Sequence, residues 1–326
     1  MPVIADVLKR SVFYLYANKE AALRGDSAGG SGFFVWAKTP NGRDCIYAVT
    51  NNHVVNRDGF KVMRLVDNQG GAVTLDMSND KWEPHSTADI AIAAMSIDHG
   101  SHSYQGIPVS WIITPELLRR ANVKLGSIDV GDEVYMVGRF SHHAGRVVNL
   151  PSARSGMISL LPDSNAKIPL KGCDDQEAFL IELRSYFGFS GSPVMWRNEV
   201  SEFNSCLKIV LKEVYGIEPI KTAPANDFPI ALLGVDAGAF GNTGFAVVIP
   251  AWFILEVLNG DVFMTQRAKM DEGDAMAADT HSFPDDDAPI TQAIFETALQ
   301  EASRRISLPD QETKETSELH RGDDCI

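Results

Sequence analysis

The sequence predicts an all-β protein built from two β modules, followed by an acidic tail. Short apolar runs rich in β-branched and aromatic residues recur between turns of Gly, Asn and Asp, which is typical of barrels and sandwiches. A helix signal at Thr114 divides these runs into two series of similar length. From residue 261 to the end, the chain carries 16 acidic and 6 basic residues, whereas the part before it is nearly balanced.

The first series of predicted strands occupies about residues 11–112. The segment ANKEAALRGDSAGGS within it is polar and is interpreted as a connector. A short helix is expected from Thr114 to about Ala121, because Thr is a good cap and Pro115 suits the first helical position. This helix bridges the two modules. The predicted strands of the first series are SVFYLY, GFFVWA, CIYAVT, 62–66, 72–77 and 90–95.

The second series occupies about residues 122–250. An insertion between Glu199 and Pro229 contains LKIVLKEV, which fits either a hairpin strand or a helix. AWFILEVL has helical apolar spacing and precedes the helix stop Asn259-Gly260, which predicts a terminal helix over 251–259. Residues 1–260 are therefore assigned to one domain. The predicted strands of this series are DEVYMVGRF, ARSGMISLL, EAFLIEL, PVMW, IALLGVDA and GFAVVIP.

The tail over 261–326 has two parts. Residues 265–289 are acidic, small and interrupted by proline, which is typical of a disordered linker. Residues 290–306 place their apolar side chains on one helical face, which predicts an amphipathic helix. This helix either packs on the protein's own surface or docks a regulatory protein partner.

Composition excludes several classes of protein. The net charge of −14 and the absence of a basic stripe argue against nucleic-acid binding. No apolar stretch is long enough for a membrane span, and the start of the chain lacks the pattern of a secretory signal. The 4 cysteines lack metal-site or disulfide-framework spacing. We therefore expect a cytoplasmic protein without membrane association, metal or cofactor.

A candidate nucleophile lies in YFGFSGSPV, residues 186–194. Ser190 stands between Gly188 and Gly191, and two glycines so close together cost backbone entropy. The simple interpretation is an ordinary Gly-rich turn. The alternative is an exposed serine whose neighbouring N–H groups must face a substrate oxygen.

A base and an acid are found elsewhere in suitable settings. His53 follows the predicted strand CIYAVT and precedes two valines that would hold its backbone. Asp89 precedes the apolar run IAIAAM, where a buried carboxylate requires a partner. Taken singly, His53 fits a structural role and Asp89 a turn cap. Their occurrence together with Ser190, each on a β-rich scaffold, favours a catalytic set.

These motifs resemble a known family. TNNHVV, TADIAI and GFSGSPV resemble the His, Asp and Ser motifs of the trypsin-like (chymotrypsin-fold) serine peptidases. TNNHVV is most similar to bacterial HtrA/Deg-type members, and GSPV is similar to bacterial glutamyl endopeptidases. LLGVDAG followed by TGFAVVIP resembles the closing strands of an HtrA-type protease domain. The resemblance covers about residues 11–258 and is specific at the three motifs.

The resemblance implies a fold and a mechanism. The fold would be two six-stranded antiparallel β-barrels with the active site in the cleft between them. His53 would be the base and then the acid, Asp89 would orient it, and Ser190 would be the nucleophile. The backbone N–H groups of Gly188 and Ser190 would form the oxyanion hole. The expected activity is that of an intracellular serine endopeptidase acting on protein or peptide substrates; the alternative is a catalytically silent or tightly regulated module that binds peptides or proteins.

The sequence departs from the family pattern in two places. Phe189 stands where zymogen-type trypsins have an acid, which makes activation by N-terminal clipping unexpected, and no PDZ-like domain follows the protease.

The specificity pocket is ambiguous. Arg184 would favour an acidic side chain before the scissile bond, Asp236 would favour a basic one, and the two could neutralise each other. Ala239 and Gly244 would leave the pocket open.

Overall fold

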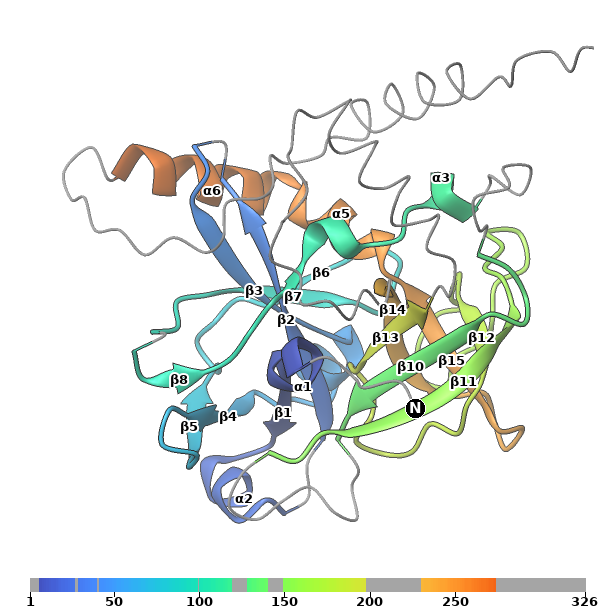
Figure 1. Cartoon of the computed structure of the whole chain (residues 1–326), viewed down its shortest axis with the longest axis horizontal. Coiled ribbons are helices and arrows are strands. Elements are labelled where there is room, and N and C mark those ends of the chain that lie inside the picture. Colours follow the sequence, from blue (N-terminus) through green and yellow to red (C-terminus); the bar gives the residue numbers. More distant parts are fainter. Residues whose placement is uncertain are drawn as a thin grey trace, which may run out of the picture. The chain divides into compact units, whose positions relative to one another are not determined.

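The computed structural model describes most of the chain up to α6, and there it is mostly β-strand with few helices (Figure 1). Two β systems follow one another along the chain, and helix α3 (Pro115–Leu118) begins the connection at the predicted place. Just before it, Ile112 bridges to Leu232 of the second system, so the connection lies against that system. The described residues are 6–26, 29–39, 41–98, 100–118, 128–139, 149–197 and 230–273.

The N-terminal system is a nine-stranded sheet with the path β5-β4-β1-β2-β3-β7-β6, from which β8 and β9 branch. The predicted closed six-stranded barrel is wrong here, because β5 and β6 do not pair within the described residues. Strand β6 has only two residues, and its Pro84 has no N–H with which to extend a ladder. The strands are β1 (Val12–Tyr16), β2 (Gly30–Lys38), β3 (Asp44–Thr50), β4 (Val62–Asp67), β5 (Ala72–Asp76), β6 (Glu83–Pro84), β7 (Ala91–Met95), β8 (His102–Ser103) and β9 (Ile107–Pro108).

Strand β1 shows why the sheet forms where the apolar runs predict it. Successive side chains point to opposite faces of a strand, and β1 buries both. Phe13 and Leu15 enter one apolar cluster, while Tyr14 and Tyr16 enter another. A strand buried on both faces requires the unbroken apolar run that SVFYLY provides.

The sequence prediction included none of the short helices of the N-terminal system, of which α2 is the most instructive. Helix α2 (Lys19–Arg24) replaces part of the polar connector. The Asn18 side chain accepts a hydrogen bond from the Ala21 N–H, and Gly25 ends the helix at φ 72°. Both capping signals are in the sequence, but the helix has only six residues. The other short helices here are α1 (Asp6–Ser11), η1 (His53–Arg57, a π-helix) and η2 (Val109–Trp111, a 3₁₀ helix).

The C-terminal system confirms the predicted six-stranded antiparallel barrel. Its strands close in the order β10-β11-β12-β15-β14-β13, and every pairing is antiparallel. The insertion between Glu199 and Pro229 lies outside the described residues. The barrel strands are β10 (Glu133–Gly138), β11 (Ser152–Leu160), β12 (Phe179–Glu182), β13 (Pro193–Arg197), β14 (Ile230–Ala239) and β15 (Phe245–Pro250).

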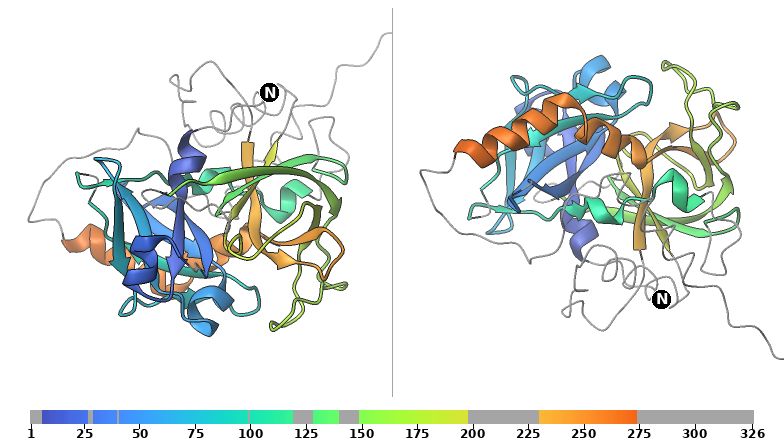
Figure 2. Two further views of the ribbon diagram at one scale, coloured as in Figure 1. Left: turned by 90° about the horizontal axis from the view of Figure 1, so that it is seen from below. Right: turned by 90° about the horizontal axis from the view of Figure 1, so that it is seen from above.

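Two helices follow the barrel. Helix α5 (Trp252–Leu258) lies where the terminal helix is predicted. Helix α6 (Asp261–Gly273) follows it. The prediction of a disordered linker over 265–289 was therefore wrong up to Gly273. In Figures 1 and 2, α6 is the orange helix beside the blue strands of the N-terminal sheet.

Tertiary contacts explain why α6 is ordered despite its acidic composition. Phe263 is 2% exposed, and the buried Arg267 guanidinium donates hydrogen bonds to Tyr47 Oη of β3 at 3.2 Å and to the Leu258 carbonyl at 2.7 Å. Farther along, the Asp271 carboxylate accepts a hydrogen bond from the Thr39 hydroxyl at 2.6 Å. The predicted helix over 290–306 lies outside the described residues.

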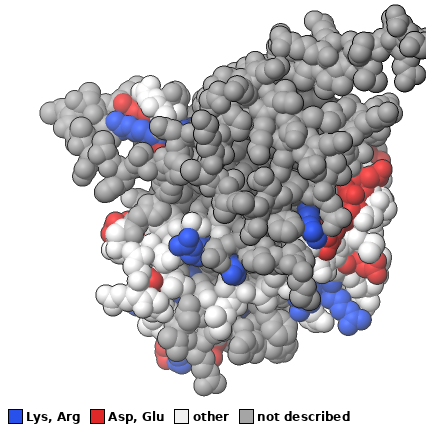
Figure 3. All heavy atoms as spheres, viewed as in Figure 1, with Lys and Arg blue, Asp and Glu red and all other residues white. Residues whose placement is uncertain are grey.

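Two surface properties are visible in the described part of the chain. No helix described there is long and apolar enough to cross a membrane. On the face shown in Figure 3, Lys and Arg side chains occur in small separate groups rather than in one stripe.

Candidate active site

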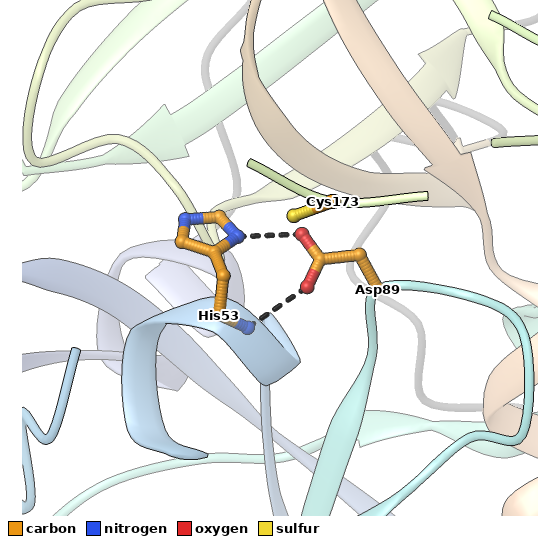
Figure 4. Close-up of side chains that lie close together, drawn as sticks. All are labelled: His53, Asp89 and Cys173. Carbon is orange, nitrogen blue, oxygen red and sulfur yellow. Dashed lines mark hydrogen bonds and ion pairs between the residues drawn. The ribbon is translucent and has the colours of Figure 1, made fainter. Parts of the chain in front are cut away.

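His53 and Asp89 are joined by two hydrogen bonds (Figure 4). Strands β3 and β7 pair with Thr50 opposite Ala91, and this register brings the residues just beyond their ends together. His53 Nδ1 lies 2.5 Å from Asp89 Oδ2, and the His53 backbone N–H donates to Oδ1 at 2.9 Å. Since a carboxylate accepts at Nδ1, the proton resides there and Nε2 is left as a hydrogen-bond acceptor.

The Asp89 backbone is held from both β systems. Its carbonyl accepts a hydrogen bond from the Asn51 side chain at 2.9 Å, and its N–H donates to Gln176 Oε1 at 2.8 Å. Gln176 is itself buried and donates to the Asp174 carbonyl at 2.8 Å. Sequence reasoning missed Gln176, because nothing in its own segment points to a residue that lies 87 positions away.

Ser190 lies in a tight turn between β12 and β13. Gly188 and Gly191 have φ angles of 97° and 90°, values that other residues rarely adopt. A Cβ on Gly191 would lie 2.0 Å from the Ser31 carbonyl oxygen and 2.4 Å from Thr50 Oγ1, so the turn also needs glycine for close packing. The N–H groups of Gly188 and Ser190 find no acceptor among the described residues.

Ser31 of β2 fixes this turn from outside. Its N–H donates to the Ser190 carbonyl at 2.8 Å, and its hydroxyl donates to the Gly188 carbonyl at 2.8 Å. The hydroxyl also accepts from the Arg139 N–H at 3.1 Å, and the Ser31 side chain is fully buried. With both carbonyls engaged by Ser31, the peptide planes of the turn are restrained. Sequence reasoning missed Ser31, which is 157 residues from Gly188.

The turn and the His53 segment are neighbours across Gly30. A Cβ on Gly30 would touch the side chain of Val54, the residue after His53, at 2.9 Å and the Ser190 carbonyl oxygen at 3.0 Å. The structure therefore brings all three motif residues into one region. Within the described residues, Ser190 Oγ and His53 Nε2 are not hydrogen-bonded to each other.

Phe189, at the position where zymogen-type trypsins have an acid, packs into the apolar core beside the turn. Its side chain is fully buried, and the Arg154 guanidinium lies 5.0 Å from the ring centroid. Arg154 also lies 4.6 Å from the ring centroid of the exposed Tyr186. Because a Cβ on Gly138 would approach the Phe189 ring to 3.0 Å, strand β10 lies directly against this side chain.

The four predicted pocket residues lie in different environments. Arg184 is exposed, and it forms no ion pair with Asp236 in the described part of the chain. Asp236 is fully buried in β14, and its carboxylate accepts a hydrogen bond from the Ser185 hydroxyl at 2.7 Å. Burial raises the pKa of Asp236 to about 6, and the Ser185 hydrogen bond partly opposes this rise. Ala239 is exposed and Gly244 is half-buried at φ 88°.

A thiol that sequence reasoning did not place also lies at the site. The Cys173 sulfur, the His53 imidazole and the Asp89 carboxylate present ligand atoms within 4.8 Å of one another (Figure 4). Arg57 Nη1 donates to Cys173 Sγ at 3.4 Å and to the Gly172 carbonyl at 2.7 Å. Burial, together with the Asp89 charge, raises the pKa of the Cys173 thiol.

Comparison with known proteins yields weak similarities only. No protein-family model matches the chain, and no curated protein matches it. Among solved structures, an inactive form of Rv3671c from M. tuberculosis H37Rv is similar at 14% identity and TM-score 0.39, over 78% of this chain and 88% of that one. A structure of HBP is similar at 11% identity and TM-score 0.43, over 79% of this chain and 94% of that one. A structure of human heparin binding protein is similar at 11% identity and TM-score 0.40, over 86% of this chain and 97% of that one. Similarities of this size assign no activity to the chain.

Proposed function

We propose that this protein is a serine endopeptidase of the trypsin-like type that cleaves peptide bonds through an acyl-enzyme. The observation that carries the proposal is the doubly hydrogen-bonded His53–Asp89 pair beside the Ser190 turn. A histidine oriented by a buried carboxylate next to a glycine-flanked serine is the arrangement that activates a hydroxyl for attack. The Gly188 and Ser190 N–H groups, which have no acceptor among the residues described, add the second requirement, donors for an oxyanion.

Each step of the proposed reaction has a residue to perform it. Ser190 Oγ attacks the scissile carbonyl while His53 Nε2 takes its proton. Asp89 keeps the proton of the imidazole on Nδ1 and stabilises the imidazolium that forms. The N–H groups of Gly188 and Ser190 bind the developing oxyanion. His53 then protonates the leaving amine, and a water molecule releases the acyl group by the same route.

A second candidate is a protease-like module that is silent or tightly regulated. It is favoured by the missing hydrogen bond between Ser190 Oγ and His53 within the described residues. Catalytic hydrogen bonds often form only in the substrate complex, so this geometry also fits an enzyme awaiting substrate. In this second candidate, we propose that a regulatory protein binds through residues 290–306. The cytoplasmic location expected from the sequence stays a prediction.

A fluorophosphonate probe tests the enzyme proposal, because it labels only an activated serine. We expect labelling of the purified protein that is lost in Ser190→Ala and in His53→Ala. His102→Ala is the matched control, since His102 lies in β8, which pairs with β4 rather than with β3 or β7, and its Nδ1 faces the Asp98 carbonyl oxygen at 3.1 Å. Labelling that persists in Ser190→Ala, or no labelling with and without peptide substrates, would refute the proposal.

Cleavage preference depends, in this proposal, on the two charged pocket residues named from the sequence, the exposed Arg184 and the buried Asp236. Because Arg184 is exposed and does not neutralise it, mutual cancellation of the two charges is not supported by the described contacts. Acidic, neutral and basic side chains before the scissile bond remain the three alternatives from the sequence. A cleavage-site profile on a denatured proteome digest distinguishes them, with Arg184→Ala and Asp236→Asn as the matched variants.

A further inference from the structure

We propose that His53, Asp89 and Cys173 form an inhibitory binding site for a thiophilic divalent cation, with Zn²⁺ as the best-matched ion. The three side chains come from separate segments: η1, the loop before β7 and the loop between β11 and β12. Figure 4 shows the sulfur beside the carboxylate and the imidazole, and their ligand atoms lie within 4.8 Å of one another. Nothing in the sequence spacing indicates this cluster, because it forms only when the two β systems pack.

The set of donor atoms suits zinc. Imidazole nitrogen, carboxylate oxygen and thiolate sulfur are its usual ligands, at about 2.0–2.3 Å from the metal, which places tetrahedral neighbours about 3.3–3.7 Å apart. His53 Nδ1 and Asp89 Oδ2 are 2.5 Å apart, so they must separate by about 0.8 Å, while the sulfur must approach by about 1.3 Å at most. A thiolate and a carboxylate together balance the charge of a divalent ion.

Two of the three ligand side chains are partly exposed to solvent. The His53 side chain is 12% exposed and Cys173 is half-buried, whereas Asp89 lies beneath them at 3%. The Arg57 guanidinium is held independently of the sulfur by the Asp58 carboxylate at 2.8 Å and by a backbone carbonyl. Arg57 can therefore keep its place when the sulfur turns to a metal, and Asp58 offsets its charge.

Metal binding would disable the proposed base. Coordination through Nδ1 replaces the hydrogen bond to Asp89, so the imidazole proton moves from Nδ1 to Nε2 and the Cys173 thiol proton is released to solvent. With its proton on Nε2, His53 cannot accept a proton from Ser190. This inhibitory consequence rests on the proposed function, whereas the metal site itself does not.

Binding is tested first without any need for activity. The protein is Ser190→Ala in a background where Cys206 and Cys325 are serine, and the probe is cadmium chloride, followed by its thiolate charge-transfer absorbance. We expect saturation at one equivalent, with the same result in Cys45→Ser, whose thiol is in β3. Cys173→Ser and Cys173→Ala should both lose the band, with melting curves recorded to verify folding.

Inhibition is then tested with zinc chloride on the active protein, each variant being normalised to its own metal-free rate. We expect chelator-reversible inhibition, and Cys173→Ser should raise the half-inhibitory concentration by at least about 10-fold, the effect of losing even an outer-shell partner. A cadmium band or zinc sensitivity that survives in folded Cys173→Ser or Cys173→Ala overturns the site. So does normal hydrolysis with neither band nor inhibition. A cysteine-dependent band in a protein that hydrolyses nothing supports the site and refutes the proposed function alone.

Discussion

Replacing Ser31 by alanine should separate the positioning of the oxyanion turn from its chemistry. The Ser31 hydroxyl donates to the Gly188 carbonyl at 2.8 Å and accepts from the Arg139 N–H at 3.1 Å, and both bonds are buried. Alanine leaves these two backbone groups without that partner. Losing a partner costs about 1–3 kcal/mol for each buried polar group, so with two groups affected we expect the free energy of unfolding to fall by at least about 2 kcal/mol.

The effect of Ser31→Ala on turnover follows from the same contacts. The Gly188 carbonyl belongs to the peptide that lies between the two peptides carrying the Gly188 and Ser190 N–H groups, so without its restraint both donors are positioned less accurately for the oxyanion. Removal of a whole oxyanion donor costs about 100–1,000-fold in kcat, so loosening one should cost about 10–100-fold. KM should change little, because the affected interaction strengthens in the transition state. Steady-state hydrolysis of a peptide ester measures both constants.

Ser11→Ala is the matched control for Ser31→Ala. Ser11 is also a fully buried serine, but its hydroxyl donates to the Leu8 carbonyl within α1 at 2.9 Å, away from the Ser190 turn. We expect Ser11→Ala to lose stability without losing turnover. If the two variants lower kcat equally, or if Ser31→Ala acts on KM alone, the assignment of Ser31 as a positioning residue is wrong.

Four further predictions concern two acids of the site, the helix that follows the barrel and the tail beyond it. Asp89→Asn should keep the fold but disfavour the reactive imidazole tautomer, lowering kcat by about 10⁴-fold in steady-state assays; a loss under tenfold would contradict the role of Asp89. The pKa of Asp236 is raised from 3.8 to about 6, because the folded state favours its protonated form. Its contribution to the free energy of unfolding is therefore present below its unfolded pKa and is lost as pH rises through about 6. The shift of about two pH units corresponds to about 3 kcal/mol, so in urea unfolding the wild type should lose about this much stability between about pH 4 and pH 8, and Asp236→Asn should lose much less. Equal pH dependence of stability in the two proteins would refute this prediction. Truncation after Gly260 removes the buried Phe263 and should destabilise the protein by at least about 3 kcal/mol in thermal or urea unfolding. Truncation after Gly273 leaves α6 in place, so a change in peptide turnover would show that the tail acts on the site, and unchanged kinetics would exclude that role.

The sequence by itself determined most strands and the local form of the site. The strands of the barrel and the long strands of the sheet follow apolar runs whose period and length are local properties, as in β1, β3 and β14. The glycine-flanked Ser190 turn was likewise visible, since positive φ angles favour glycine wherever they occur. The pairing of His53 with Asp89 was predicted from their places beside two strands, and the structure joins them.

Only the tertiary structure decided what surrounds these residues. Ser31, Gln176 and Cys173 reach the site across long separations in sequence, and no local pattern encodes which segments will meet. Helix α6 is ordered by burial of Phe263 and Arg267 against neighbouring elements, which overrides a composition typical of linkers. The N-terminal sheet is open in the described residues for a tertiary reason too, because closure of a barrel depends on whether its two edge strands, here β5 and β6, pair with each other. Strand and turn formation are local, whereas buried polar contacts and sheet edges are decided when whole β systems pack together.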